Sequence, residues 1–278
     1  MSVETASIAG LLAAALGGEN DETSWLAIRE LQKRATPPAF EAACALCADS
    51  DPVRRSCGAK ILSEFGYAGW SGEDLSTACA GALLPLLEDI DENVRFEGAR
   101  ALSKRKDNRC LPILIAMTSH PELDTRWSVV NALGRFDDRA ATDAVIGMTR
   151  DNEKLIRDWA TFALGSLTDA DYPELRDALF ARIGDADSAT RGEALRGLAA
   201  RRDDRIWPAL DHEIRSLDPD DENGDMVLDC CLDAVESLKH PRLIAPLEAV
   251  IQSLDERMPE RWRERIQNAI AVCKPEAS

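Results

Sequence analysis

Apolar residues recur at helical spacing through a phrase that the chain writes four times between Asp91 and Asp204. The four copies read VRFEGARALSKRKDNR, TRWSVVNALGRFDDRA, IRDWATFALGSLTDAD and TRGEALRGLAARRDDR. In the second copy Thr125, Val129, Ala132 and Leu133 stand before and after one arginine at intervals that place them on a single helix face. Each copy therefore predicts one amphipathic helix.

The arginine of each copy recurs at a nearly fixed distance. Arg95, Arg126, Arg157 and Arg191 stand 31, 31 and 34 residues apart. A period of this size indicates stacked repeats, and a polar turn followed by a second apolar segment makes each repeat a helical hairpin. We expect helix N-termini at the polar residues before each phrase, namely Asp91, Asp124, Asn152 and Asp187.

The close of each phrase carries a family resemblance. An aliphatic–arginine pair is followed by Ala101-Leu102-Ser103, Ala132-Leu133-Gly134 or Ala163-Leu164-Gly165. This pattern resembles the short HEAT repeats, the subgroup related to phycobilisome lyase repeats, and residues 157–165 resemble a run common in uncharacterised bacterial HEAT proteins. The resemblance implies an all-α protein, a right-handed α-solenoid (α-α superhelix) of HEAT/armadillo-like type. It implies little about function, because such repeats serve as scaffolds, adaptors and, less often, enzymes.

The pattern extends, more weakly, over the rest of the chain. We expect about eight hairpins in a single solenoid over residues 1–278, with N-terminal capping repeats at 1–66, regular repeats at 72–204 and diverged repeats at 205–278. In the repeat that follows Asp204, Leu228 stands at the position where the earlier repeats have their arginine. A longer loop at 66–72 carries Tyr67 and Trp70 and is either part of a binding rim or an aromatic plug between layers. Pro85 should distort the helix that contains it.

The net charge of the chain limits the classes of partner that we expect it to bind. The chain has 50 acidic and 33 basic residues, a formal net charge of −17. A field of that sign repels phosphate backbones and anionic bilayers, so we expect a protein or peptide partner, a basic one, rather than nucleic acid or membrane. The first residues lack the basic lead of a secretory signal, which favours a cytoplasmic protein. The oligomeric state is open, with a monomer as the default.

The eight cysteines do not suggest a cofactor or metal site. Cys44 and Cys47 form a CxxC motif, but within a helical pattern and without a second pair or a nearby histidine. Cysteine acting as a small buried hydrophobe explains them better. We therefore expect no cofactor, no metal and no disulfide framework.

No arrangement of nucleophile, base and orienting group can be identified from spacing, so catalysis is the less favoured alternative. It would be a HEAT-type enzyme resembling a phycobilin lyase or a DNA glycosylase of the alkylpurine kind. For the glycosylase, Trp127, Trp159, Asp158 and Arg196 are the residues of interest, although the charge balance argues against it.

A non-enzymatic scaffold or adaptor is the favoured function, and its surface can be located. Positions one, two and five after each repeat arginine point away from the apolar stripe of the second helix, which in HEAT arrays lines the concave face. The candidate partner-binding residues there are Phe96, Arg100, Trp127, Asn131, Asp158, Trp159, Phe162, Glu193 and Arg196. Tryptophan and arginine carry much of the energy of protein interfaces. The alternative is that these rings pack, half buried, against neighbouring repeats.

The repeat arginines have a separate predicted role. HEAT families use Arg–Asp pairs as a ladder between layers, and the regular spacing of Arg95, Arg126, Arg157 and Arg191 suggests the same here. The acids expected to pair with them lie in the same or the adjacent repeat, such as Asp124, Asp137, Asp169 and Asp203.

Overall fold

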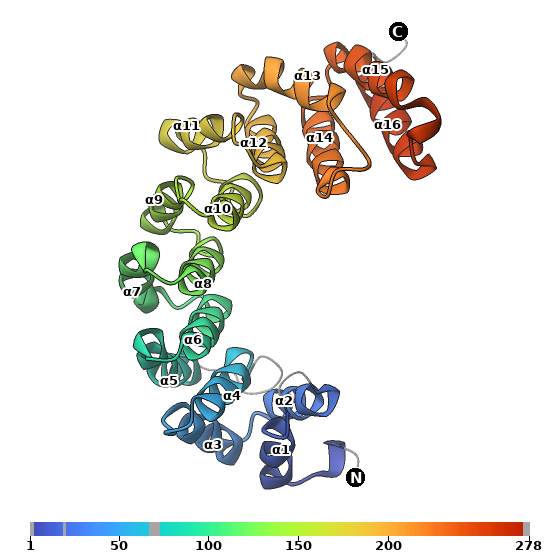
Figure 1. The fold of residues 1–278 in the computed structure, drawn as a ribbon. Helices are drawn as coiled ribbons and strands as arrows, with labels where there is room; N and C mark the ends of the chain where they lie inside the picture. Colours follow the sequence, from blue (N-terminus) through green and yellow to red (C-terminus); the bar gives the residue numbers. More distant parts are fainter. Residues whose placement is uncertain (1–2, 19–20, 67–72, 275–278) are drawn as a thin grey trace. The chain divides into compact units, whose positions relative to one another are not determined.

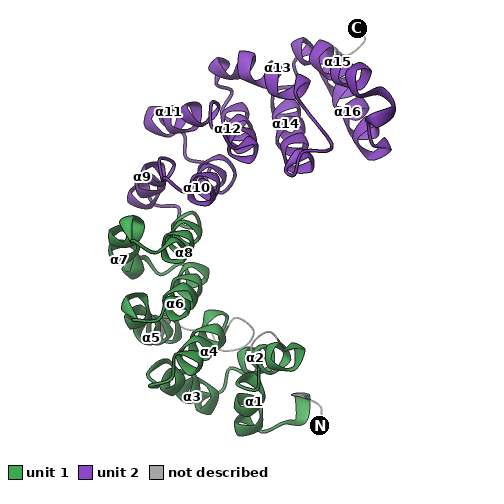
Figure 2. Ribbon diagram, viewed as in Figure 1, with its two compact units in different colours: residues 1–136 green, residues 137–278 purple. Residues whose placement is uncertain are grey.

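The computed structural model describes residues 3–18, 21–66 and 73–274. Its regular elements in these residues are all helical, and they divide into two compact units, residues 1–136 and 137–278 (Figure 2). The predicted loop with Tyr67 and Trp70 lies outside the described residues.

The first unit contains four helical hairpins (Figure 1). They are α1 (Ile8–Ala15) with α2 (Glu22–Arg34), α3 (Pro37–Cys47) with α4 (Pro52–Ser63), α5 (Glu73–Leu83) with α6 (Glu92–Arg105), and α7 (Leu111–Ala116) with α8 (Leu123–Leu133). Short 3₁₀ segments lie before or between these helices: η1 (Val3–Thr5), η2 (Leu84–Glu88), η3 (Asn108–Cys110) and η4 (Met117–Ser119).

The second unit repeats the arrangement. Its helices are α9 (Arg139–Met148), α10 (Lys154–Ser166), α11 (Pro173–Arg182), α12 (Ser188–Ala200), α13 (Trp207–Arg215), α14 (Gly224–Leu238), α15 (Ile244–Leu254) and α16 (Glu260–Cys273), with η5 (Asp204–Ile206), η6 (Pro241–Leu243) and η7 (Asp255–Arg257). The described chain thus forms eight hairpins, and the predicted all-α solenoid is confirmed.

Second helices pack on second helices within each unit. In the first, α4 lies against α6 and α6 against α8; in the second, α10, α12, α14 and α16 pack in that order. Small residues allow the close approach. A Cβ on Gly197 of α12 would lie 2.6 Å from the Cα of Gly165 on α10, closer than any real pair of such atoms. The apolar stripe predicted from the phrases is buried here, as Val129, Leu133 and Leu164 illustrate.

Two local predictions need refinement. Asp91 and Asp187 cap their helices by accepting backbone N–H bonds, but Asp124 lies inside α8 and Asn152 precedes the N-cap residue Glu153 of α10. Pro85 does not merely kink a helix: α5 ends at Leu83 and the chain continues as the 3₁₀ helix η2 around the proline. Proline has no N–H for the α-helical bond pattern, which is why the tighter turn replaces it.

The repeat arginines hold the loop inside their own hairpin. In each case Nη1 donates to two successive carbonyls, those of the residues six and five positions earlier, at 2.7–3.2 Å. Arg55, Arg95, Arg126, Arg157 and Arg191 all do so. A charged donor thus satisfies two backbone carbonyls of the loop between the two helices of a hairpin. These bonds hold the loop in one conformation.

The other edge of the guanidinium reaches the next hairpin. Arg55 donates to both carboxylate oxygens of Asp89 at 2.7 Å, and Arg157 donates to those of Asp185 at 2.9 and 3.1 Å. Arg191 pairs in the same way with Glu213 at 3.0 and 2.9 Å. Arg95 contacts Glu122 and donates to Thr125 Oγ1. We call the five repeat arginines, together with these partners in the next hairpin, the arginine ladder.

For Arg95, Arg157 and Arg191 the predicted acidic partners were wrong. The carboxylates are those of Asp89, Glu122, Asp185 and Glu213, not of Asp124, Asp137, Asp169 or Asp203. The physical reason is direction. A side chain near a helix start points back toward the helix N-terminus, where Arg95 and Arg157 meet Glu122 and Asp185 of the next loop. The expected acids Asp137, Asp169 and Asp203 lie inside the phrases, toward the other end of the helix.

The carboxyl groups of Asp89 and Asp185 have lowered pKa values although they are partly buried. By itself burial would raise the pKa of Asp185, but the hydrogen bonds from Arg157 and from the Asp187 N–H outweigh it and hold that pKa below its ordinary value. The pKa of Asp89 is lowered in the same way by Arg55 and the Asp91 N–H. The ionised carboxylates are therefore more stable in the folded chain than in water.

A second set of arginines, which the sequence reasoning missed, lies at the opposite ends of the second helices. Arg105, ten residues after Arg95, donates to the carbonyls of Leu62 and Phe65 beyond the end of α4 at 2.9 and 3.2 Å. Arg201, ten residues after Arg191, donates to the carbonyls of Leu164 and Thr168 at the end of α10 at 2.9 and 2.8 Å. Each satisfies orphan carbonyls of the preceding repeat's second helix.

The ladder predicts a stability difference between buried and exposed arginines. Replacing Arg157 by alanine leaves Asp185, whose side chain is 3% exposed, without its bidentate partner, and should lower the free energy of unfolding by about 2 kcal/mol. Arg215→Ala, which removes an exposed pair with Asp211 on one helix, should cost less than about 0.5 kcal/mol. Urea unfolding followed by circular dichroism measures both. Equal stability of the wild type and Arg157→Ala would refute the role of the ladder.

Candidate functional site

The predicted partner-binding residues all lie on second helices. We call this set the second-helix surface: Phe96, Arg100, Trp127 and Asn131 of α6 and α8 in the first unit, and Asp158, Trp159, Phe162, Glu193 and Arg196 of α10 and α12 in the second. All are half-buried except Glu193, which is buried. The rings are therefore neither fully exposed nor part of the core.

In the first unit two aromatic rings form a stack. Phe96 and Trp127 are nearly parallel, with an interplanar angle of 2° and ring centroids 5.4 Å apart. The amide of Asn131 donates to the carbonyl of Trp127 at 2.9 Å, so part of its hydrogen-bonding capacity is used within α8. Arg100 is paired with Glu97 on α6 at 2.6 Å. This part of the surface therefore presents two stacked aromatic rings beside an arginine whose charge is balanced by Glu97.

In the second unit the aromatic pair lies on one helix. Trp159 and Phe162 of α10 meet edge to face, with ring centroids 5.7 Å apart and an angle of 88°. They are three residues apart and thus on the same helical face. The contact between the two half-buried rings restricts their motion before any partner binds. Binding would therefore cost less side-chain conformational entropy.

A buried polar network lies next to this pair. Glu193 is 4% exposed; its carboxylate accepts from Arg196 at 3.1 Å, from Ser166 Oγ at 3.4 Å and from Cys230 Sγ at 3.6 Å. Burial raises the pKa of Glu193. Its predicted solvent exposure was wrong because α12 packs between α10 and α14, so that the position two residues after the arginine faces a neighbouring helix.

Asp158 is the most perturbed carboxyl group of the surface. Burial, reinforced by the negative charge of Glu193, raises the pKa of Asp158 to about 6. One of its carboxylate oxygens is buried without a hydrogen-bond partner. The group changes its charge close to neutral pH, a behaviour that the sequence could not reveal because it depends on contacts between repeats.

A groove opens beside this network in the second unit. It has a volume of about 460 Å³ and is lined by the end of α10, by α12 and by α14. Arg196, Arg201, Asp169 and Asp233 provide its charges, and Arg196 Nε lies 2.9 Å from Asp233. Because Arg201 is committed to backbone carbonyls, the groove offers a partner the charges of Arg196 and of two exposed carboxylates, Asp169 and Asp233.

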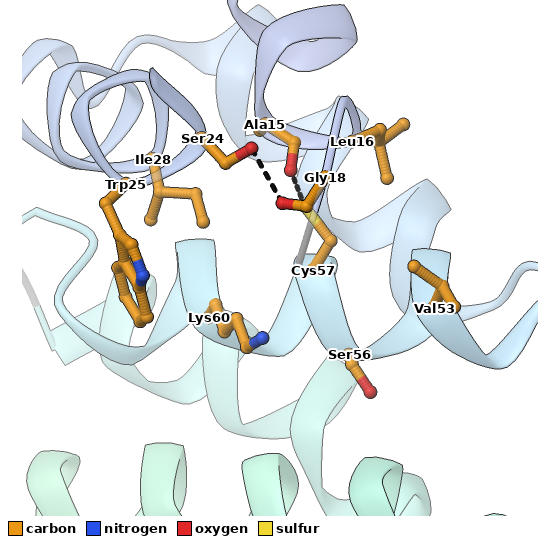
Figure 3. Close-up of a pocket in the computed structure, with 10 residues that line it drawn as sticks. All are labelled: Ala15, Leu16, Gly18, Ser24, Trp25, Ile28, Val53, Ser56, Cys57 and Lys60. Carbon is orange, nitrogen blue, oxygen red and sulfur yellow. Dashed lines mark hydrogen bonds between the residues drawn. The ribbon is translucent and has the colours of Figure 1, made fainter. Parts of the chain in front are cut away.

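A second hollow, near the N-terminus, is too small for a ligand. Trp25 and Ile28 of α2 face Val53, Cys57 and Lys60 of α4 across it (Figure 3). Ser24 Oγ donates to the carbonyl of Gly18 at 2.9 Å, which closes one side. With a volume of about 40 Å³ it has room for a water molecule and little more.

The cysteines behave as small hydrophobes. Seven are buried, Cys44 is half-buried, and none forms a disulfide. Burial raises the pKa of the Cys57 thiol to about 11, so it is protonated and unreactive at neutral pH. Among the described residues, no three His, Cys, Asp or Glu side chains are grouped so that they could hold a metal ion. Of the helices described, none is long and apolar enough to cross a membrane.

The hairpins, the ladder between them and the surface on their second helices define a class, the α-solenoid repeat proteins. The family model of HEAT repeats matches residues 80–165. Residues 80–165 of the chain are therefore HEAT repeats.

Similar proteins agree with this assignment of the fold. Protein YibA of Escherichia coli K12 is 23% identical over 239 residues, which cover 82% of this chain and 79% of that protein. The X-ray structure of YibA aligns with a TM-score of 0.72 and 21% identity, covering 99% of this chain and 94% of that one. A structure of the CpcE–CpcF complex of phycocyanin lyase from Nostoc aligns with a TM-score of only 0.45 and 19% identity, a likeness too low to transfer function.

Asp158 predicts a pH dependence of stability. Its folded pKa of about 6 lies above the ordinary value of 3.8, so its ionisation opposes folding above about pH 6, and this penalty disappears as the pH falls toward 4. Asp158→Asn should therefore raise the melting temperature at about pH 8 and leave it nearly unchanged at about pH 4.

Asp185→Asn supplies the comparison of opposite sign. The pKa of Asp185 is lowered, so its ionised form stabilises the fold above its ordinary value of 3.8, and that variant should melt lower at about pH 8. Differential scanning calorimetry at the two pH values measures both variants. An equal shift of Asp158→Asn at both would contradict the assigned burial of charge.

Proposed function

We propose that this chain is a non-enzymatic scaffold or adaptor that holds a segment of another protein on its second-helix surface. The observation that carries the proposal is the Trp159–Phe162 pair, half-exposed and braced edge to face, on the same helix whose end lines the charged groove of about 460 Å³. Pre-ordered aromatic rings beside a charged groove are the composition of an interface centre, where a few aromatic and arginine residues carry most of the binding energy.

Charge supports a basic partner. The net charge of −17 attracts positively charged segments and repels nucleic acid and anionic membranes. In the groove, Asp233 is half-exposed and shares Arg196 with the buried Glu193, so one cation there serves two carboxylates. A lysine or arginine side chain of the partner would complete this local charge balance.

The wider architecture fits the same function. We propose that residues 1–278 act as one continuous repeat array and that the ladder arginines Arg95, Arg126, Arg157 and Arg191 stabilise stacking without touching the partner. Their guanidinium groups are already occupied by loop carbonyls, and three of them by carboxylates or a threonine of the next hairpin. Cytoplasmic placement belongs to this proposal as well.

A single observation favours the enzymatic alternative of a lyase or glycosylase. Asp158 has a pKa of about 6 and an unpartnered carboxylate oxygen, properties suited to a group that transfers a proton near neutral pH. A scaffold does not need this proton. In a scaffold, Asp158→Asn can change only the affinity for the partner, whereas in an enzyme it would abolish turnover of a substrate while binding persisted.

The test is affinity capture with matched aromatic variants. Trp159→Ala and Phe162→Ala should each reduce recovery of a specific partner about 30-fold, the effect of losing about 2 kcal/mol at an interface centre. Phe180→Ala, which removes an exposed ring on the first helix α11, should leave recovery unchanged. Circular dichroism must show all three folded. Recovery of the same proteins by the wild type and the α10 variants would contradict the proposal.

A further inference from the structure

Large aliphatic side chains project into solvent at the loop rim of the first unit, one in each of three successive hairpins. Val53 begins α4, Ile90 lies in the loop before α6, and Leu123 begins α8; they are 47%, 94% and 36% exposed. We call these three residues the aliphatic rim. They stand two, five and three residues before Arg55, Arg95 and Arg126, so exposed aliphatic residues gather at the loop end of three successive second helices.

Ile90 is the most exposed of them, and the fold does not require its side chain. Its backbone is fixed, because Arg95 Nη1 donates to its carbonyl at 3.1 Å and to that of Asp89 at 2.7 Å. A polar side chain would satisfy this loop equally well, since one that is 94% exposed contributes almost no burial to stability. The isoleucine is therefore available to a partner in a fixed position.

An apolar groove lies directly beside it. Its walls are Leu87 at the end of η2 and Pro112, Ile113, Ala116 and Met117 of α7 and η4, and its volume is about 470 Å³. Glu88 and Asp89, the two residues before Ile90, line the same groove. An aliphatic side chain of a partner that enters a groove of this size can contact the groove walls on one side and the exposed Ile90 on the other.

The charges around the groove are acidic. The exposed carboxylates are Glu88, which lines the groove, and Glu122, which contacts the lining residue Arg95. The positive charge of Arg95 is paired with Glu122, and the lining carboxylate Asp89 is paired with Arg55. Of the remaining groups, Arg126 donates to the carbonyl of His120, and the imidazole of that histidine accepts from the Glu122 N–H. Acidic groups thus face a partner on both sides of the apolar walls.

We propose that the aliphatic rim is a second docking surface, separate from the second-helix surface, and that it binds a basic polypeptide segment whose aliphatic side chain fills the groove beside Ile90. Charge complementarity selects this occupant. Anionic bilayers and nucleic acid are repelled by the same carboxylates, and a second copy of this chain would bring acidic groups against acidic groups. The proposal does not depend on the function assigned to the second-helix surface.

The test uses a fluorescein-labelled peptide of alternating lysine and leucine blocks, and a matched peptide with serine in place of leucine. Fluorescence anisotropy should show that the leucine peptide binds at least about tenfold more tightly than the serine peptide, the value of one well-buried aliphatic side chain. Ile90→Ser should weaken the leucine peptide about tenfold, with an unchanged melting temperature. Leu167→Ser removes a side chain that is 45% exposed outside this rim and should have no effect.

Other results would overturn the proposal. Equal binding of the two peptides, or an equal loss in Leu167→Ser, would mean that only the general negative charge attracts them. Binding to phosphatidylserine vesicles that Ile90→Ser abolishes would assign the rim to membranes, and a dimer in analytical ultracentrifugation that the same variant dissociates would assign it to self-association. Loss of the leucine peptide in Trp159→Ala but not in Ile90→Ser would assign the peptide to the second-helix surface and overturn the proposal for the rim, so the two surfaces are tested separately.

Discussion

The fold depends on one interaction, an arginine side chain that joins two hairpins through its two edges. One nitrogen fixes the turn of its own repeat by donating to two carbonyls, and the other edge holds a carboxylate of the next repeat. Only a guanidinium has enough donors in a fixed plane to do both, and lysine could not replace it. In a repeat array each hairpin contacts only its neighbours, so the pairs made by Arg55, Arg95, Arg157 and Arg191 contribute at the four interfaces where they recur.

The ladder also determines which residues can become a binding surface. It secures the loop ends of the second helices, while Arg105 and Arg201 secure the opposite ends of α4 and α10 by satisfying their last carbonyls. Between these ends, small residues such as Gly165 and Gly197 bring the helices close together. What remains facing outward is a narrow strip on each second helix, which explains why Trp159 and Phe162 are half-buried and Glu193 is enclosed.

Much of the fold could be predicted from the sequence because it repeats locally. The spacing of Arg95, Arg126, Arg157 and Arg191 and the apolar stripe beside them contain the hairpin and its period. The acids of the ladder were missed although a signal existed: Asp49, Asp89, Asp151 and Asp185 each stand six residues before a repeat arginine, and His120 takes that place where Glu122 replaces the aspartate as partner. For the ladder acids Asp89 and Asp185, this pattern held the answer in the loop, outside the helical phrase; Glu213, the partner of Arg191, lies in helix α13 and has no such signal.

Other features of the candidate surfaces could not be predicted, because they arise between repeats. The burial of Glu193 depends on how closely α14 approaches α12, and the raised pKa of Asp158 depends on that buried neighbour. Nothing in the repeat pattern distinguishes Ile90, and only the structure shows that Glu88 and Asp89, the residues before it, line an apolar groove. Helical periodicity identifies the face of one helix, but exposure is decided by the helices packed on either side.

The most direct test of the central claim is a double-mutant cycle between Arg157 and Asp185, with the free energy of unfolding measured for Arg157→Ala, Asp185→Ala, the double variant and the wild type. If the ladder couples neighbouring hairpins, the two substitutions will be strongly non-additive, with a coupling of about 1.5–3 kcal/mol. A coupling below about 0.5 kcal/mol would contradict the account, because the pair would then be incidental to stacking.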